Sequence, residues 1–271
     1  MINGLLFDLD GTIIDSELHY DNLNIELLSN YGKKYEPLKE KPLLMGLPNI
    51  AYATDIVKRH NLLMTPEEFS ELRREKIKQA YREKVKYILG FETFFQKLIK
   101  HFNCNKAIVT GCNKENFDLV DARLNLTKLF DGHIIRTDDV GKHKPDPAPF
   151  IYAAKKIGVD CKNCLVFEDA PSGIVSGYRA GAKVVALTTT LDKKSLIKHT
   201  LEIDPTIEIN SLLFINKFND SSLKKIISYT KKNTEYYSSI AASSNQSFNP
   251  FWTSFSFPKT LSILLCVNSI I

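Results

Sequence analysis

The sequence lacks the features of a disulfide-stabilised or membrane-spanning protein. Its five cysteines are an odd number at irregular spacing, which is typical of a reducing compartment rather than of a disulfide framework. No stretch reaches the roughly 20 apolar residues that a membrane span needs. The apolar start of the chain stops at Asp8, so we expect no signal peptide. These absences favour a soluble, cytoplasmic protein.

Charge of one sign is also scarce. The 36 Lys and Arg residues face 31 Asp and Glu residues, which leaves a net charge of +5 over 271 residues. So small a surplus is weak support for a nucleic-acid partner, and we expect no such partner. Small anionic molecules are compatible with this charge. Apolar residues make up 44% and charged residues 25%, the proportions of a globular protein. We expect a monomer without a membrane partner.

The segment 238–271 has a composition of its own. Lys259 is its only charged residue, and Ser, Asn, Phe and Pro dominate it without periodicity. We expect a poorly ordered extension. A segment that touches a membrane or a partner is the alternative, although it would lack the basic face that such segments usually carry.

Short apolar runs, each followed by polar or glycine residues, are typical of buried strands. In the second half of the chain they alternate with helical patterns, which indicates βαβ units and a parallel sheet with helices on both faces. The sequence therefore predicts an α/β fold with a Rossmann-like, doubly wound parallel sheet. The expected strands are 4–7, 107–109, 133–135, 164–167 and 183–187, and the expected helices between them are 115–124, 148–156 and 173–179.

A long helical stretch separates the first two expected strands. Residues 16–31 carry apolar side chains at amphipathic spacing. Thr65, followed by a proline and by Glu68, has the pattern of a capping box, and we expect the helix it starts to continue to about residue 88. The sequence predicts a second, all-helical subdomain here. We place the α/β core at 1–15 and 90–235 and the helical cap at 16–89.

Polar side chains follow the expected strands. Asp8 and Asp10 come directly after the first strand, two residues apart, so both can face one site. Ligands of an open parallel sheet bind outside the carboxyl ends of its strands, where the other polar groups converge as well. Clustered carboxylates repel one another unless a hard cation such as Mg2+ lies among them, whereas a lysine and a hydroxyl suit phosphate. The combination indicates phosphoryl transfer. The other members of the group are Thr110, Gly111, Lys144, Glu168 and Asp169.

On these motifs the chain resembles the haloacid dehalogenase-like (HAD) hydrolases, a superfamily that uses an aspartate nucleophile. The matching motifs are 8–12, Thr110, Lys144 and 167–173, and the likeness covers residues 2–190, with a last strand and helix to about residue 232. The inserted helices correspond to the family's small helical cap. Within the superfamily the chain looks most like the subgroup of β-phosphoglucomutase and sugar-phosphate phosphatases, and above all like pseudouridine-5'-phosphatase.

The resemblance implies a phosphatase mechanism. Asp8 would attack phosphorus and form an aspartyl phosphate. Asp10 would protonate the leaving alkoxide and then take a proton from the attacking water. Ion-pump relatives carry lysine at the place of Asp10 and hold their aspartyl phosphate longer, so Asp10 favours rapid turnover.

The resemblance also implies phosphate and metal ligands. Thr110 and the main-chain N–H of Gly111 would bind phosphoryl oxygens, and Lys144 would offset the charge of nucleophile and phosphate. Lys142 is the alternative to Lys144. Mg2+ would be held by Asp8, the main-chain carbonyl of Asp10, Asp169 and, directly or through water, Glu168.

Substrate choice is expected from the cap. Glu17 and Tyr20 at its start, and Met45 and Gly46 in its loop, are the candidate contacts. The basic run 73–86 is interleaved with glutamates, and we interpret it as a solvated helix face.

The expected reaction is Mg2+-dependent hydrolysis of a small phosphorylated metabolite, either pseudouridine 5'-phosphate or a sugar phosphate. The similar phosphomutases carry a cap-loop arginine that grips a second phosphate, and none stands here between Gly32 and Val57. A phosphomutase of the β-phosphoglucomutase type and an inactive, phospholigand-binding relative are the alternatives.

Overall fold

The computed structural model describes residues 1–231 except 46 and 48, so Gly46 and the segment 238–271 lie outside the described residues. In the described part, six parallel strands form one sheet with the order β3-β2-β1-β4-β5-β6. The predicted α/β fold is confirmed. The strands are β1 (Gly4–Phe7), β2 (Asn105–Thr110), β3 (Ile134–Arg136), β4 (Cys164–Glu168), β5 (Lys183–Leu187) and β6 (Leu213–Ile215).

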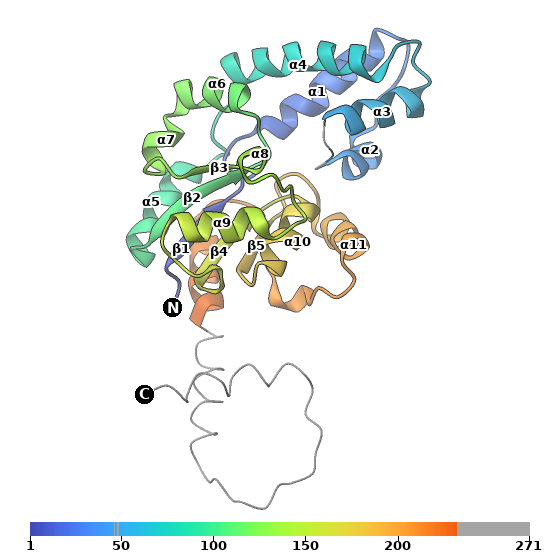
Figure 1. The fold of residues 1–271 in the computed structure, drawn as a ribbon. Helices are drawn as coiled ribbons and strands as arrows, with labels where there is room; N and C mark the ends of the chain where they lie inside the picture. The colour runs from blue at the N-terminus through green and yellow to red at the C-terminus, as the bar shows by residue number, and fades with distance from the viewer. Residues whose placement is uncertain (46, 48, 232–271) are drawn as a thin grey trace, which may run out of the picture. The chain divides into compact units, whose positions relative to one another are not determined.

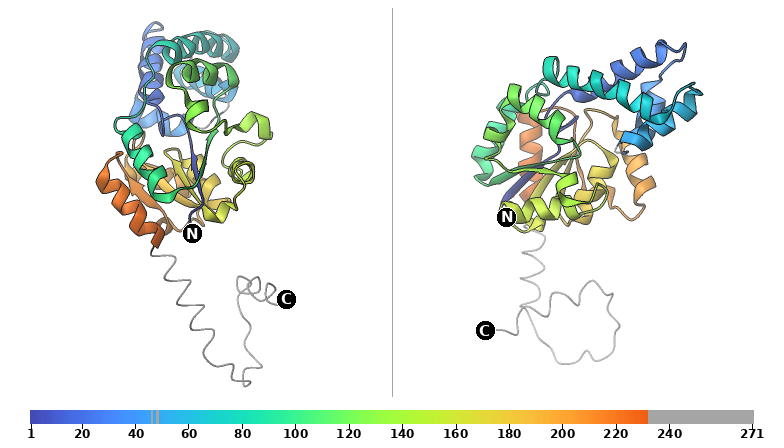
Figure 2. Two further views of the ribbon diagram at one scale, coloured as in Figure 1. Left: turned by 90° about the vertical axis from the view of Figure 1, so that its left-hand side faces the viewer. Right: turned by 45° about the horizontal axis from the view of Figure 1, so that its top comes forward.

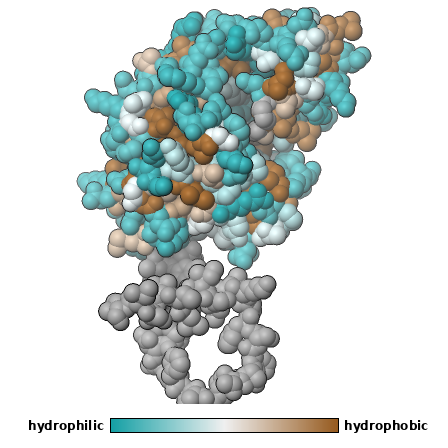
Figure 3. All heavy atoms as spheres, viewed as in Figure 1, coloured by the Kyte–Doolittle hydropathy of each residue, from teal (hydrophilic) through white to brown (hydrophobic). Residues whose placement is uncertain are grey.

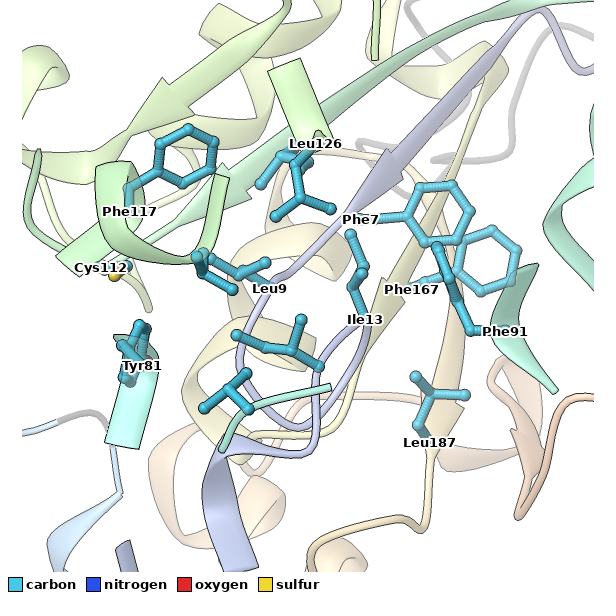
Figure 4. Packing of buried hydrophobic residues seen from close by; sticks show 14 of the residues in the cluster. Phe7, Leu9, Ile13, Tyr81, Phe91, Cys112, Phe117, Leu126, Phe167 and Leu187 are labelled. Carbon is cyan, nitrogen blue, oxygen red and sulfur yellow. The ribbon is translucent and has the colours of Figure 1, made fainter. Parts of the chain in front are cut away.

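Strand β1 lies in the middle of the sheet and is buried on both faces. Its four residues are all buried, and it pairs with β2 on one side and β4 on the other. Phe7 lies opposite Phe167 in this register, and the two rings stack with centroids 4.3 Å apart (Figure 4). The chain order reverses beside β1, which is the usual place for a ligand site in such a sheet.

Helices cover both faces of the sheet (Figure 2). Leu5 and Phe7 pack in one apolar cluster, with residues of α5 and of the helical segment 220–231, while Leu6 packs in a second cluster with α9, α10 and α11. Because side chains on both faces of the sheet are buried, the strands are apolar at successive residues and not only at every second residue. The core helices are α5 (Phe91–Phe102), α6 (Lys114–Leu124), α7 (Leu126–Leu129), α8 (Thr137–Val140), α9 (Ala148–Lys156), α10 (Pro171–Arg179) and α11 (Lys193–Ile203).

The first four of the five helices between β1 and β2 are α1 (Ser16–Ser29), α2 (Pro37–Leu44), α3 (Asn49–His60) and α4 (Pro66–Glu83). Figure 1 shows them together above the carboxyl edge of the sheet. The prediction that the last of them continues to about residue 88 is wrong. Helix α4 ends at Glu83. Residues 86–88 do not continue the helix, because they pair with residues 13–15, the segment that connects β1 to the first cap helix.

The two connections between cap and sheet lie side by side. The main-chain N–H of Asp15 donates to the carbonyl of Lys86 at 3.0 Å, and that of Ile88 donates to the carbonyl of Ile13 at 2.9 Å. The carboxylate of Asp15 also accepts from the N–H of Lys86 at 2.7 Å. The cap therefore leaves and rejoins the core at one place, a few residues beyond Asp10.

Three further facts concern the surface, the helices and the cysteines of the described residues. The face in Figure 3 is mostly hydrophilic, with separate apolar groups. No helix in residues 1–231, apart from the two undescribed positions, is long and apolar enough to cross a membrane. The four cysteines of the described part are free thiols.

The capping box at the start of α4 is present as the sequence predicts, and it can be tested. The hydroxyl of Thr65 accepts from the N–H of Glu68 at 3.2 Å, and the Glu68 carboxylate accepts from the N–H of Thr65 at 2.8 Å. Thr65→Ala should lower the free energy of unfolding by about 1 kcal/mol, measured by urea denaturation. Thr65→Ser keeps the hydroxyl and should stay near wild type; an equal loss in both variants would mean that the cap bond contributes nothing.

Candidate active site

Asp8 stands at the carboxyl end of β1, at the switch point of the sheet. Its main-chain N–H donates to the carbonyl of Phe167 at 3.0 Å, and its carboxylate oxygen Oδ1 accepts from Lys144 Nζ at 2.6 Å. Burial raises the pKa of Asp8 well above its usual range; the charge of Lys144 opposes this shift, whereas the neighbouring acids add to it. A carboxylate in such a place needs positive charge nearby to stay ionised.

Lys144 supplies part of that charge. Its ammonium donates to Asp8 Oδ1 at 2.6 Å, to Glu168 Oε1 at 2.6 Å and to the carbonyl of Val109 at 2.9 Å. Burial lowers the pKa of Lys144, but the charges of Asp8 and Glu168 outweigh burial and raise it above its ordinary value. The alternative, Lys142, has a side chain that is 63% exposed and approaches Asp146 instead. The structure therefore brings Lys144, and not Lys142, to Asp8.

Three buried carboxylates meet at this point. Oxygens of Asp8, Glu168 and Asp169 all lie within 4.8 Å of one another. Thr12 Oγ1 donates to Asp169 Oδ1 at 3.1 Å, and the hydroxyl of Thr190 donates to Oδ2 of the same carboxylate. Burial, followed by the charge of Glu168, raises the pKa of Asp169 well above its usual range.

This group of oxygens fits Mg2+. Lys144 contacts two of the three acids, so a divalent cation would balance the remaining charge of the group, and an all-oxygen donor set is the kind that Mg2+ prefers. The side chain of Asp10 lies outside the group, so any contribution from that residue would come from its main-chain carbonyl, as the sequence analysis expects.

Two glycines allow the backbone to approach these acids. Gly11 has φ +73°, and a Cβ atom there would lie 2.1 Å from Asp169 Oδ2. A Cβ atom at Gly173, in the first turn of α10, would lie 1.7 Å from Glu168 Oε1. Both positions exclude a side chain, because real Cβ atoms do not come that close to another atom.

The side chain of Asp10 points into the cap. Its Oδ1 accepts from the hydroxyl of Tyr20 at 3.4 Å and also from the hydroxyl of Tyr81, and the two tyrosine oxygens are 2.5 Å apart. Burial raises the pKa of Asp10, and the hydrogen bonds from the two tyrosines oppose that shift. Tyr81 was missed as a site residue, because in the sequence it is one more apolar position of a helix face.

The hydroxyl of the second motif, Thr110, has a partner within its own turn. The hydroxyl of Thr110 accepts from the N–H of Cys112 at 2.9 Å, and Thr110 is fully buried beneath the cavity wall. Gly111 and Cys112 line the cavity, whereas Thr110 does not. Contact of the Thr110 hydroxyl with phosphate stays a prediction, and its observed role is to shape the turn that presents Gly111.

The acids form the floor of a cavity of about 860 Å³ between sheet edge and cap. Glu17, Tyr20 and Met45, three of the expected cap contacts, line it. Glu17 is held by Lys41, whose Nζ lies 3.2 Å from Glu17 Oε2 and 2.7 Å from Asp21 Oδ2. The size is within the usual range for a pocket that binds a small molecule.

The interpretation of run 73–86 as a solvated face is wrong for Arg73. This side chain is only 9% exposed and lines the cavity, with its guanidinium carbon 4.0 Å from the ring centroid of Tyr52 and 5.3 Å from that of Tyr20. The signal was present in the sequence: Arg73 occupies the same helix stripe as Phe69, Ile77 and Tyr81, four residues apart, all of which are buried.

Comparisons with known proteins agree with this geometry. The probable pseudouridine-5'-phosphatase of Drosophila melanogaster is 29% identical over 206 residues, which cover 73% of this chain and 87% of the relative. The fructose-1-phosphate phosphatase YqaB of Escherichia coli (strain K12) is 28% identical over 184 residues, 67% of this chain and 94% of the relative. The chain spans 54% of the length of another relative, the bifunctional riboflavin kinase/FMN phosphatase of Arabidopsis thaliana, at 29% identity over 215 residues.

A solved structure shows the same fold. The putative β-phosphoglucomutase from Thermotoga maritima superposes with a TM-score of 0.61 at 22% identity, covering 79% of this chain and 94% of that one. The profile of the family described as haloacid dehalogenase-like hydrolase matches residues 5–187, a range that includes every core motif discussed above. The phosphatases among the relatives confirm the expected enzyme class, a phosphoric monoester hydrolase. The chain belongs to the haloacid dehalogenase-like hydrolases.

Proposed function

We propose that the chain is a Mg2+-dependent phosphatase that hydrolyses a small phosphomonoester through an aspartyl phosphate on Asp8. The observation that carries the proposal is the pair Asp8 and Asp10 at the floor of the cavity, with Lys144 Nζ 2.6 Å from the first of them. A protein that only binds phosphate needs neither a nucleophile nor an acid/base beside it.

Two steps account for the chemistry. In the first, Lys144 holds Oδ1 of Asp8 while the other oxygen of that carboxylate attacks phosphorus; the ester P–O bond breaks, and the proton of Asp10 passes to the leaving oxygen. In the second, water gives its proton to Asp10 and attacks phosphorus; the bond to Asp8 breaks and phosphate leaves. The raised pKa of Asp10 helps it to hold the proton that the first step requires.

The surrounding groups neutralise charge and orient phosphate. Asp8, Asp169, Glu168 and the main-chain carbonyl of Asp10 would hold Mg2+, which when bound supplies positive charge to the phosphoryl oxygens. Gly111 lines the cavity and offers its main-chain N–H to phosphate. Both contributions are electrostatic.

The substrate class rests on the cavity and on the relatives. A cavity of about 860 Å³ suits a small phosphorylated metabolite. Relatives named for pseudouridine 5'-phosphate and fructose 1-phosphate support a nucleotide-like or sugar phosphate. Glu17, Tyr20 and Met45, with Gly46, are the proposed cap contacts.

A phosphomutase is the second candidate, and one observation favours it. The chain has no arginine between Gly32 and Val57 to bind a second phosphate, but Arg73 supplies a cap cation to the cavity from another helix. A mutase would convert β-glucose 1-phosphate to glucose 6-phosphate with little release of phosphate.

The test is phosphate release from a panel of phosphomonoesters, with Mg2+ and with EDTA. The panel contains pseudouridine 5'-phosphate, fructose 1-phosphate, glycerol 3-phosphate and β-glucose 1-phosphate. We expect release that requires Mg2+ and prefers one substrate. Release that is undiminished in EDTA would contradict the metal assignment, and glucose 6-phosphate as the main product would identify a mutase.

Asp8 and Asp10 should respond differently to substitution. Asp8→Asn should abolish turnover, because the amide is a poor nucleophile, while circular dichroism and the melting temperature stay close to wild type. Asp10→Asn should slow hydrolysis about 100-fold or more, the usual size of a lost general acid. Full activity of Asp8→Asn would show that Asp8 is not the nucleophile. A loss below tenfold in Asp10→Asn would show that Asp10 is not the general acid/base.

The close approach at Gly173 gives a test of the metal site. Gly173→Ala would force Glu168 to move, since the new Cβ would lie 1.7 Å from Oε1, and we expect the Mg2+ concentration for half-maximal activity to rise by about 10- to 100-fold. The matched control is Gly177→Ala in the same helix, whose Cβ meets Val166 Cγ1 at 2.9 Å. That variant should lose stability without a change in Mg2+ dependence. An identical response of the two variants would mean that Glu168 does not position the metal.

A further inference from the structure

Arg73 is a buried cation that has no anionic partner among the described residues. It lines the same cavity as Asp8 and Asp10 and is 9% exposed. Its Nε is buried and has no hydrogen-bond partner in the described part of the chain. It also makes no ion pair there, in contrast to Arg74, whose guanidinium lies 2.6 Å from Glu71. Burying a charge in this way is unfavourable unless a partner arrives.

Two tyrosine rings pack against the guanidinium of Arg73 but supply no negative charge to it. Tyr52 and Tyr20 approach it with ring centroids 4.0 Å and 5.3 Å from its central carbon. Tyr52 is itself fixed, because its hydroxyl accepts from Asn24 Nδ2 at 2.7 Å. Cation–π contacts of this kind use the faces of the guanidinium and leave its N–H edges free for hydrogen bonds. Those edges suit the two oxygens of a carboxylate or phosphate.

The other cavity cations are already paired. Lys41, in the cap wall, has two carboxylates within 3.2 Å, those of Glu17 and Asp21. Lys144, on the floor, is shared between Asp8 and Glu168. Among the buried cations of the described cavity wall, Arg73 is therefore the one that can pair its charge with a ligand.

The position of Arg73 relates it to the reaction centre. The hydroxyl of Tyr20 is 3.4 Å from Asp10 Oδ1, and the ring of the same tyrosine lies beside Arg73. One tyrosine side chain therefore spans the distance between the proposed acid/base and the unpaired guanidinium. A substrate with its ester oxygen at Asp10 would extend the rest of its small carbon skeleton along this wall.

We propose that Arg73 binds a second anionic group of the substrate, a carboxylate or a second phosphate, at the end remote from the phosphoryl group that is transferred. The inference rests on the proposed phosphatase function and narrows its substrate class to phosphomonoesters that carry another oxyanion. A phosphomutase intermediate with two phosphates would use the same contact.

Matched substrate pairs test the proposal in the wild-type enzyme. Glycerol 3-phosphate against 3-phosphoglycerate tests a carboxylate, and fructose 1-phosphate against fructose 1,6-bisphosphate tests a second phosphate. We expect at least one pair to show a kcat/KM about tenfold or more higher for the member with two anionic groups, chiefly through a lower KM. The pair that shows the preference identifies the anion. Absence of a preference in both pairs overturns the proposal without any variant.

Substitution of Arg73 assigns the preference to this residue. Arg73→Met should lower the ratio of kcat/KM within the favoured pair by about 10- to 100-fold, the usual effect of losing a charge-assisted hydrogen bond. Arg73→Lys should restore part of the ratio. Arg59→Met removes one charge from the cap outside the cavity, where Arg59 pairs with Asp55, and should leave the ratio unchanged. If Arg73 only supported the cap, Arg73→Met would weaken both members of a pair equally, and that result refutes the proposal.

Binding separates this proposal from the phosphatase function. The same pairs are titrated calorimetrically into Asp8→Asn and into the double variant Asp8→Asn/Arg73→Met, with Mg2+ present. If no substrate is hydrolysed but the two-anion member binds more tightly, and this advantage disappears without Arg73, the phosphatase assignment fails and the second-anion site stands. If substrates are hydrolysed but neither rates nor binding depend on Arg73, the phosphatase assignment stands and the second-anion site fails.

Discussion

Three buried carboxylates, two of which share one lysine, are the constraint around which the rest of this structure is arranged. The parallel register that pairs Phe7 with Phe167 necessarily brings the next residues, Asp8 and Glu168, side by side. Solvent screens their repulsion only weakly, because both are buried. Lys144 compensates part of it, and the donors around Asp169 hold that carboxylate in place. The cost of such a cluster is tolerable only at a site that binds a cation or changes its charge during a reaction.

The sequence predicted most of the core because its signals are local. A short apolar run that ends in Asp8 and Asp10 defines both a strand and the two acids that follow it. The rule that ligands bind at the carboxyl ends of parallel strands then places Lys144, Glu168 and Asp169 in the same region. What the sequence could not decide was which of two nearby lysines reaches the nucleophile, since both lie in one loop. That choice depends on three acceptors from three separate elements.

The cap was harder to predict because its functional residues look like ordinary helix residues. Arg73 belongs to a basic run, and its neighbours Arg74 and Lys76 do form surface ion pairs. Only the spacing of four residues from Phe69 and Ile77 showed that it faces inward. In the same way Tyr81 is an apolar-face residue by periodicity, and its contact with Asp10 exists only when the cap lies over the core. Tyr20 contacts both Asp10 and Arg73, so the proposed chemistry and the proposed selectivity meet in one side chain.

The paired connections at 13–15 and 86–88 have a consequence for how this chain can change over evolutionary time. A segment whose two ends are already hydrogen-bonded to each other resembles a cassette, because its replacement leaves almost no additional loop to close. Helices of another length or sequence could be exchanged there without shifting the register of β1 against its neighbours. The sheet can therefore keep one reaction while successive insertions supply different walls to the cavity, and new substrates can be acquired without rebuilding the acids beneath.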